Sequence, residues 1–266
     1  MLEWLGRLAL SLLPLVCVCA HSRAAGPDVW PIYRPPQPRL HSHAQWAMPV
    51  MLVGAGFLLV KGVHLSGANF HWRDTYSHRR ESWMSVDDVI QWGPIVTAVG
   101  MRVAGVRGYS ASGTDFAETA TVAALSMGIV VNAVKLMRIS LRPDRRGWNS
   151  FMSGHTALAF MGAELLRMEY GAQYPWVAAA GYGLAISTGA MRVYHRRHWI
   201  GDVVAGAGVG LAAAWFGRLL QPHVDDMLCA LRARRRRAAE SAGHVALSVA
   251  PMLEQRAVGM ALSLQF

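Results

Sequence analysis

The chain has 266 residues, of which 53% are apolar, and its mean hydropathy is positive. This composition is typical of a membrane protein rather than a soluble domain. The formal charge of +10 is scattered between apolar blocks, with one dense run at Arg234 to Arg237. A nucleic-acid-binding protein would show a stripe of basic residues with interleaved aromatic residues, and the sequence contains no such stripe. Loops and a membrane surface explain the charge better.

Residues 1–25 match a secretory signal peptide, with a basic residue near the start, an apolar core and then small residues. An uncleaved N-terminal anchor is the alternative, although the apolar core is short for a membrane span. Either reading sends the chain to the cell envelope. Residues 26–47 are rich in proline and are predicted to be a linker. The three cysteines, at positions 17, 19 and 229, indicate neither a disulfide framework nor a metal cluster.

Apolar blocks rich in glycine and alanine predict an all-α, membrane-embedded bundle of about six helices over residues 48–220. The expected helices are at about 48–63, 86–105, 115–138, 155–169, 175–191 and 202–220. Several of them are short for a hydrocarbon core, so shallow or protein-shielded helices remain open. Residues 221–266 are expected to form a basic tail, and from about residue 245 the sequence alternates weakly, as a strand does.

The first of three polar segments lies at the end of a long apolar helix and contains Lys135 and Arg142. These cations are close to two helical turns apart, so they share one face and can clamp a phosphate. The alternative is a basic helix end that complements the helix dipole, with Pro143 as the stop signal. The sequence of this segment alone leaves both readings open.

The second segment is expected to begin the next helix, with Ser153 as its N-cap. Gly154 allows the backbone to approach a ligand, and the N–H groups of a helix N-terminus form an anion site. His155 stands at that site, and an imidazole is suited to donating a proton to a leaving oxygen at neutral pH. The alternative is a capping loop whose histidine is only interfacial.

The third segment contains Arg192, His198 and Asp202. Because four residues separate His198 from Asp202, one helical turn places both on the same face, and a carboxylate can then orient the imidazole. The other ring nitrogen is left as a nucleophile toward phosphorus. A metal-binding pair is the alternative, but no further histidine or glutamate has the spacing of a usual site. His195 has no role in this scheme, and we expect it to line the rim of the site.

Together these segments resemble the type 2 phosphatidic acid phosphatase (PAP2) superfamily, whose motifs read Lys-x6-Arg-Pro, Pro-Ser-Gly-His and Ser-Arg-x5-His-x3-Asp. The residues that match in order and spacing are Lys135, Arg142, Pro143, Ser153, Gly154, His155, Arg192, His198 and Asp202. The resemblance covers roughly residues 48–220 and implies six membrane passes around a site near one membrane face. It also implies that His198 attacks phosphorus and His155 protonates the leaving group. Neither a metal nor another cofactor is expected.

Two positions depart from these motifs: Met152 stands where the family usually has proline, and Met191 where it often has serine. Neither replaces a group assigned to chemistry, although rate and substrate range are left open. One alternative is a vanadate-dependent haloperoxidase, a soluble family that shares the anion site and would hold vanadate on His198. Another is a catalytically silent envelope protein that binds a lipid phosphate.

A site that opens between apolar helices at a bilayer surface favours an amphiphile, so the expected partners are the membrane and a lipid phosphate. The run from Phe160 to Arg167 and the signal-like start resemble lipid A phosphatase-like members of Gram-negative envelopes. Lipid A is therefore favoured over undecaprenyl pyrophosphate and phosphatidate. An inner-membrane protein whose site faces the periplasm is expected, and with Arg234 to Arg237 inside the positive-inside rule agrees. A cleaved signal peptide would place residue 26 outside, and six full passes from there would invert this orientation. Either one helix is then re-entrant or does not span the membrane, or the N-terminal segment is uncleaved. The oligomeric state is not written in the sequence.

Overall fold

A computed structural model describes residues 43–66, 86–143, 147–241, 246–254 and 257–265 of the chain. The chain forms two compact units, Met1–Gln221 and Pro222–Phe266. The expected signal peptide at residues 1–25 and the linker up to residue 42 lie outside the described residues.

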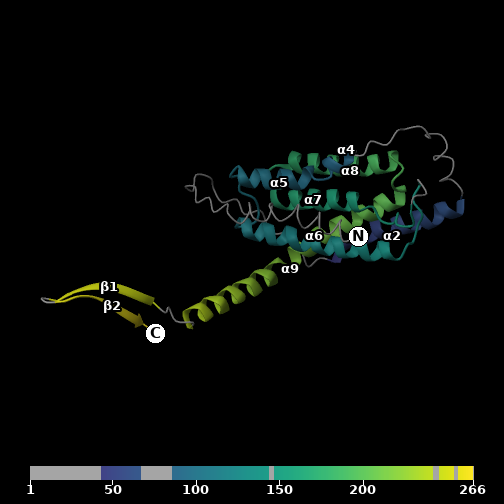
Figure 1. Ribbon diagram of the computed structural model, residues 1–266. Coiled ribbons are helices and arrows are strands. Elements are labelled where there is room, and N and C mark those ends of the chain that lie inside the picture. The colour runs from purple at the N-terminus through teal and green to yellow at the C-terminus, as the bar shows by residue number, and fades with distance from the viewer. Residues whose placement is uncertain (1–42, 67–85, 144–146, 242–245, 255–256, 266) are drawn as a thin grey trace. The chain divides into compact units, whose positions relative to one another are not determined.

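The first unit is a helical bundle (Figure 1). Its helices are α2 (His43–Ser66), α4 (Val86–Ile90), α5 (Gly93–Val103), α6 (Gly113–Leu136), α7 (Gly154–Tyr170), α8 (Pro175–Tyr194) and the first part of α9 (Ile200–Ser241). The predicted all-α bundle is therefore confirmed. The helix expected at 86–105 is broken into α4 and α5, because Pro94 in the first turn of α5 has no N–H to donate to the preceding turn. α2 begins at His43 rather than Met48, which brings Trp46 against Trp215 with ring centroids 6.4 Å apart.

α9 continues through Pro222 to Ser241, where the sequence predicted a tail from residue 221. Alanine, leucine and arginine dominate the residues after this proline, and these are strong helix formers, so local propensity extends the helix. In the second unit, β1 (Ala246–Glu254) and β2 (Ala257–Gln265) pair antiparallel, with Ala250 opposite Ala261. The strand-like alternation expected from about residue 245 is thus confirmed.

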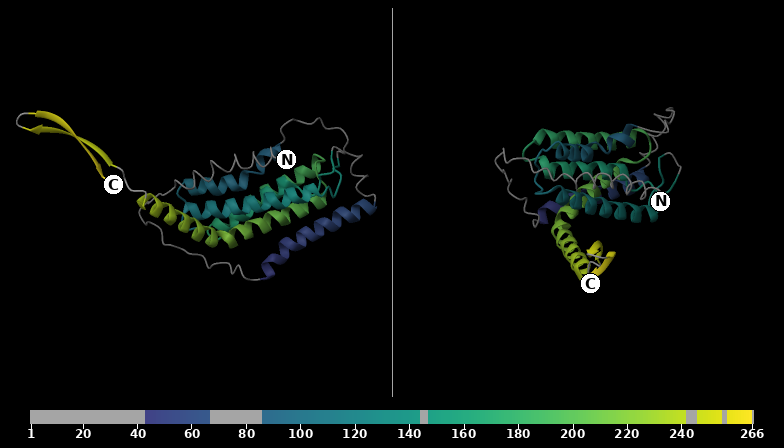
Figure 2. Two further views of the ribbon diagram at one scale, coloured as in Figure 1. Left: turned by 60° about the horizontal axis from the view of Figure 1, so that its bottom comes forward. Right: turned by 60° about the vertical axis from the view of Figure 1, so that its left-hand side comes forward.

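α7 is the central helix of the bundle, and thirteen of its 17 residues are buried. It packs against α4, α5, α6 and α8, and glycines of α9 contact its backbone. Figure 1 shows α7 between α8 and α6, and Figure 2 shows the helices running side by side in two further views. Any group at the N-terminus of α7 is therefore surrounded by several helices.

Small residues bring α9 into backbone contact with α7. A Cβ atom on Gly206 would lie 2.5 Å from the carbonyl oxygen of Ser153, and one on Gly210 would meet the backbone of Ala157. These glycines are four residues apart, so they share one face of α9, as small residues do where helices pack closely. The close approach places the beginning of α9 beside the N-terminus of α7.

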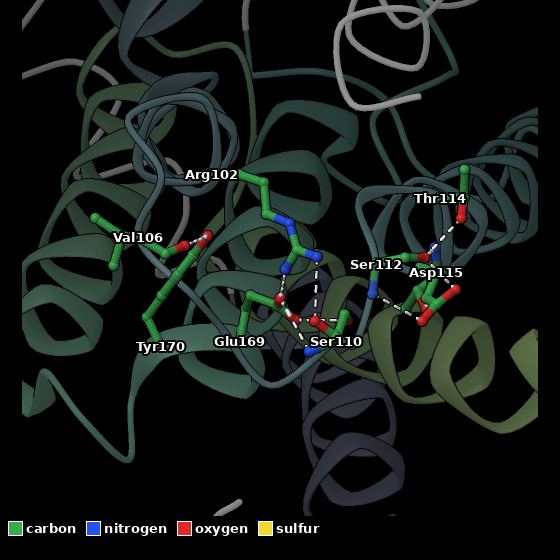
Figure 3. A network of polar contacts seen from close by, with 9 residues as sticks. Arg102, Val106, Ser110, Ser112, Thr114, Asp115, Glu169 and Tyr170 are labelled. Atoms are coloured by element: carbon green, nitrogen blue, oxygen red, sulfur yellow. Dashed lines mark hydrogen bonds and ion pairs between the residues drawn. The ribbon is translucent and has the colours of Figure 1, made fainter. Parts of the chain in front are cut away.

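A polar network closes the other end of α7 (Figure 3). Arg102 donates to Oε1 of Glu169 over 2.7 Å, and the Ser110 hydroxyl donates to Oε2 over 2.8 Å. At the start of α6, Ser112 and Asp115 form a capping box. Because the Glu169 side chain is buried, its charge needs these partners. Glu169 stands roughly 20 Å along α7 from His155, and α7 is mainly apolar between them.

The outer faces of the helices are apolar. Large apolar side chains that are at least 60% exposed include Leu58 on α2, Leu125 and Ile129 on α6, and Ile186 on α8. Two helices are long and apolar enough to cross a membrane by length and composition, Gly113–Leu136 and the Ile200–Ala238 part of α9. A soluble domain rarely exposes apolar surface over so many elements, whereas hydrocarbon solvates it well.

We predict that Gly206→Ala destabilises the bundle by roughly 1–3 kcal/mol, because the added methyl group overpacks the contact between α9 and α7. Thermal unfolding of detergent-purified protein measures this loss. The matched control is Gly183→Ala on α8, where a Cβ atom meets nothing within 4 Å. Equal melting temperatures for the two variants would contradict the close packing.

Candidate active site

Backbone hydrogen bonds join the three predicted motif segments at one end of the bundle. The Ser150 N–H donates to the Ser140 carbonyl over 3.2 Å, which ties the loop after α6 to the loop before α7. The Ser153 N–H donates to the Asp202 carbonyl over 3.0 Å, which ties that second loop to α9. The Trp199 indole N–H donates to the Leu141 carbonyl over 2.8 Å. Residues far apart in the sequence therefore meet in one site.

His198 lies in the loop between α8 and α9, and only 2% of its side chain is exposed. Its Nδ1 atom is 2.8 Å from the Ser150 carbonyl oxygen. Because a carbonyl only accepts hydrogen bonds, Nδ1 carries the proton in this pair. The neutral ring therefore has its lone pair on Nε2, the form in which that atom is nucleophilic.

Burial also keeps this ring neutral. It lowers the pKa of His198 from an ordinary 6.5 to about 4, against the opposing effect of Asp202. Arg192 and Arg142 act on His198 in the same direction as burial, because two nearby cations disfavour a third. At neutral pH the imidazole is thus unprotonated on Nε2.

Asp202 is fully buried at the start of α9. The sequence predicts that it pairs directly with His198, and its Oδ2 atom lies 3.5 Å from Nδ1, farther than the Ser150 carbonyl oxygen. The same oxygen accepts from the Ser150 hydroxyl, and from the Trp199 N–H over 2.9 Å. Asp202 thus holds both Ser150, whose carbonyl orients the ring, and the residue that follows His198.

Three cations surround this histidine. Arg192 is almost fully buried at the end of α8, and among the described residues its Nε atom is a buried donor without a hydrogen-bond partner. Arg142 donates from Nε to the Asn149 side chain over 2.9 Å. Lys135 interacts electrostatically with Arg142, Arg192 and Asp202. The three cations come from two different predicted motifs.

The N-terminus of α7 has the predicted geometry. Ser153 is its N-cap and accepts from the Thr156 N–H, and Gly154 is the first helical residue. The N–H groups of the first turn of a helix are available to an anion. His155 follows in the same turn, and its Nε2 atom is 2.9 Å from Oδ1 of Asp88. Burial lowers the pKa of His155, and the hydrogen bond with Asp88 opposes that shift.

Residues that the sequence did not indicate complete the site. Asp87 on α4 is fully buried and accepts from Nη1 of Arg192 over 2.6 Å. His195, expected at the rim, is 31% exposed, with its Nδ1 atom 3.2 Å from Asp87. Asp88 contacts both Arg192 and His155, and Ser150 orients His198.

Within the described ranges, no group of three or more His, Cys, Asp or Glu side chains is arranged as a metal site.

Met152, which replaces the family's usual proline, is 3% exposed and packs in the core cluster next to Phe151. The Phe151 ring packs edge-on against Phe57 of α2, with centroids 6.0 Å apart. Apolar packing therefore holds the loop before α7 at this position. Met191, one residue before Arg192, is partly buried.

Part of the chain is similar to known proteins. Residues 107–224 match the model of the PAP2 superfamily. This part of the chain is therefore similar to PAP2 superfamily domains. The PAP2 match includes all the predicted site residues from Lys135 to Asp202, whereas α4 and its two aspartates lie before it.

A stretch of 132 residues is 40% identical to the Lipid A 1-phosphatase of Porphyromonas gingivalis. The alignment covers 50% of this chain and 30% of that protein, so the chain spans less than a third of its relative's length. No solved structure matches the chain.

We predict that His198 makes folding stability depend on pH. The unfolded ring gains a proton near pH 6.5, while the buried ring resists it down to about pH 4. The stabilisation that comes from burying the neutral His198 ring is therefore fully present above pH 6.5. Roughly 3 kcal/mol of it is lost as pH falls through that window. Thermal unfolding of detergent-purified protein between pH 4 and 7 measures the decline.

His198→Gln provides the comparison, because other titrating groups contribute equally to both proteins. The melting temperature of this variant should fall less steeply over the same window. Identical slopes for the two proteins would show that the ring is not held in its neutral form.

Proposed function

We propose that this protein is a membrane phosphatase that hydrolyses the phosphate of an envelope lipid through a phosphohistidine intermediate. The PAP2 domain supports the reaction class, and the similarity to a Lipid A 1-phosphatase favours lipid A as the substrate. Undecaprenyl pyrophosphate, a phosphoanhydride, and phosphatidate, a phosphomonoester, also carry a terminal phosphoryl group and are the alternative substrates. The exposed apolar faces of the helices support a substrate that arrives from the bilayer.

The orientation of His198 is the observation that carries this proposal. With Nδ1 donating to the Ser150 carbonyl, Nε2 has a free electron pair at neutral pH. In the first step Nε2 attacks phosphorus and the P–O bond to the lipid breaks. The leaving oxygen takes a proton from His155. The products of this step are the dephosphorylated lipid, phosphorylated His198 and neutral His155.

In the second step a water molecule hydrolyses the intermediate. Neutral His155 accepts a proton from the water, whose oxygen attacks phosphorus as the bond to His198 Nε2 breaks. Inorganic phosphate leaves, and both histidines return to their starting forms. Asp202 and Ser150 keep His198 in one orientation through both steps.

The developing negative charge is stabilised by fixed groups. Lys135, Arg142 and Arg192 supply cations, and Arg192 has a buried Nε–H available to a phosphate oxygen. The N–H groups in the first turn of α7, beginning at Gly154 after the Ser153 cap, add a partial positive charge. These donors are held in place before the reaction, so the chemistry needs no metal ion.

We predict that detergent-purified protein releases inorganic phosphate from at least one of lipid A, undecaprenyl pyrophosphate and phosphatidate, with EDTA present. His198→Ala should lower the rate by at least about a thousandfold, because the variant has no nucleophile. Colorimetric phosphate release measures both proteins. The matched control is His223→Ala, because His223 is an exposed histidine on α9.

Each outcome of this assay has a definite meaning. Release that EDTA abolishes would contradict the metal-free mechanism, and release that survives in His198→Ala would contradict the nucleophile. If lipid is bound but no phosphate is released from any of the three, the protein is a lipid-phosphate-binding protein instead of an enzyme. The lipid hydrolysed fastest identifies the substrate class.

The proposed location is the inner membrane, with the site facing the periplasm. We predict that a phosphatase reporter fused after residue 144 is active, and that one fused after Arg237 is inactive, because basic segments stay in the cytoplasm. A fluorescent-protein fusion at each position is the complementary control. An inactive phosphatase reporter at residue 144 would place the site in the cytoplasm.

A further inference from the structure

α4 brings two carboxylates to the site from outside the PAP2 match. The match begins at residue 107, whereas Asp87 and Asp88 lie on Val86–Ile90. Asp88 and His155 are 67 positions apart in the sequence, and Asp87 and Arg192 are 105 apart. No motif indicates these contacts, which only the fold creates.

One oxygen of Asp88 contacts two site residues. Oδ1 lies 2.9 Å from Nε2 of His155 and 3.3 Å from Nη1 of Arg192. The side chains of His155 and Asp88 are 21% and 37% exposed, so the pair borders the open side of the site. Asp88 therefore contacts both His155, the proposed acid, and Arg192, a proposed phosphate-binding cation.

Asp87 holds this arrangement in place. Its Oδ2 atom accepts from Nη1 of Arg192 over 2.6 Å, and its Oδ1 atom is 3.2 Å from Nδ1 of His195. Asp87 is fully buried, and a buried carboxylate is stable only when it is paired with cations and donors. The ion pair fixes α4 against α8, so the neighbouring Asp88 has a defined position.

A carboxylate beside an imidazole has two effects. It accepts a ring N–H, which fixes the ring orientation, and it favours the protonated ring through its negative charge. Burial of His155 and the cation Arg192 favour the neutral ring instead, while Asp87 and Asp88 oppose them. A protonated imidazole has two N–H groups, so one can stay on Asp88 while the other serves the leaving oxygen.

We propose that Asp88 is a positioning residue for His155, holding the ring by Nε2 and favouring, against the effect of burial, the protonated form that donates to the leaving group. This inference rests on the proposed phosphatase function. It assigns α4 a part in the reaction, although α4 supplies no group that reacts. The leaving oxygen takes its proton from His155, and Asp88 remains a carboxylate throughout.

The first test compares Asp88→Asn with wild type in the phosphate-release assay. Asparagine keeps the size of the side chain but removes its charge. We expect kcat to fall at least about tenfold with KM nearly unchanged, because proton donation weakens while phosphate contacts remain. The basic limb of the pH–rate profile should move to lower pH, because the protonated ring has lost its anionic partner. Asp88→Glu, which restores the charge, should recover part of kcat.

Val89→Ala is the matched control, because Val89 is an exposed residue of the same short helix. Its kcat and pH profile should equal those of wild type. An Asp88→Asn enzyme with unchanged kcat and an unchanged basic limb would overturn the proposal. A faster Asp88→Asn enzyme would also overturn it, because Asp88 would then only compete with the substrate phosphate for Arg192.

A second measurement needs no turnover. Ring ¹⁵N chemical shifts of histidine-labelled protein in detergent, with His155 assigned from a His155→Gln sample, follow the protonation of this ring against pH. In Asp88→Asn the His155 midpoint should fall by about one pH unit. An unchanged midpoint would overturn the pairing. If wild type releases no phosphate but the midpoint falls, the pairing stands and the proposed function fails.

Discussion

The buried carboxylate of Asp202 is the contact on which the site depends. It accepts hydrogen bonds from the Ser150 hydroxyl and the Trp199 N–H, while its own backbone carbonyl accepts from Ser153. Ser150 in turn presents its carbonyl to His198. A buried polar network is stabilising only when nearly all its members have hydrogen-bond partners. A change in one member therefore alters the hydrogen bonds of the others. The orientation of the His198 ring, the proposed nucleophile, therefore depends on the same contacts that fix the course of the two loops.

That network exists because α9 and α7 approach more closely than ordinary side chains permit. Gly206 lies one turn after Asp202, and its Cα hydrogens leave room for the Ser153 carbonyl. A bulkier residue would push the start of α9 away from the N-terminus of α7, and the Ser153–Asp202 backbone contact would lengthen with it. In a bilayer, where water does not drive apolar helices together, such van der Waals contact is a main source of association. Helix packing thus sets the geometry of the proposed active site as well as the stability.

Much of this arrangement follows from local sequence. Apolar blocks indicate the helices, and the spacing of Lys135, His155 and His198 with their neighbours indicates the site, because each motif is a short run of sequence. The helical faces predicted for two of the motifs are wrong, because α6 ends at Leu136 before Arg142, and His198 precedes the start of α9 at Ile200. Asp87 and Asp88 were not predictable in this way, since their partners lie far along the chain and two acidic residues in a short polar stretch have no periodicity. The role of Ser150 depends on a backbone carbonyl, which every residue has. The continuation of α9 beyond Pro222 required helix propensity to be weighed above a stop signal.

The charges explain why carboxylates lie beside the proposed phosphate site. Lys135, Arg142 and Arg192 gather three positive charges in a largely buried region, and Asp87, Asp88 and Asp202 match them with three negative ones. A phosphate dianion that enters this balanced site adds negative charge next to His155, which favours the protonated ring. Substrate binding and protonation of the acid are then linked, and by reciprocity protonation strengthens binding. Asp88 supplies the same electrostatic influence before the substrate arrives, so the ring is already oriented and its neutral form is favoured less than burial alone would make it.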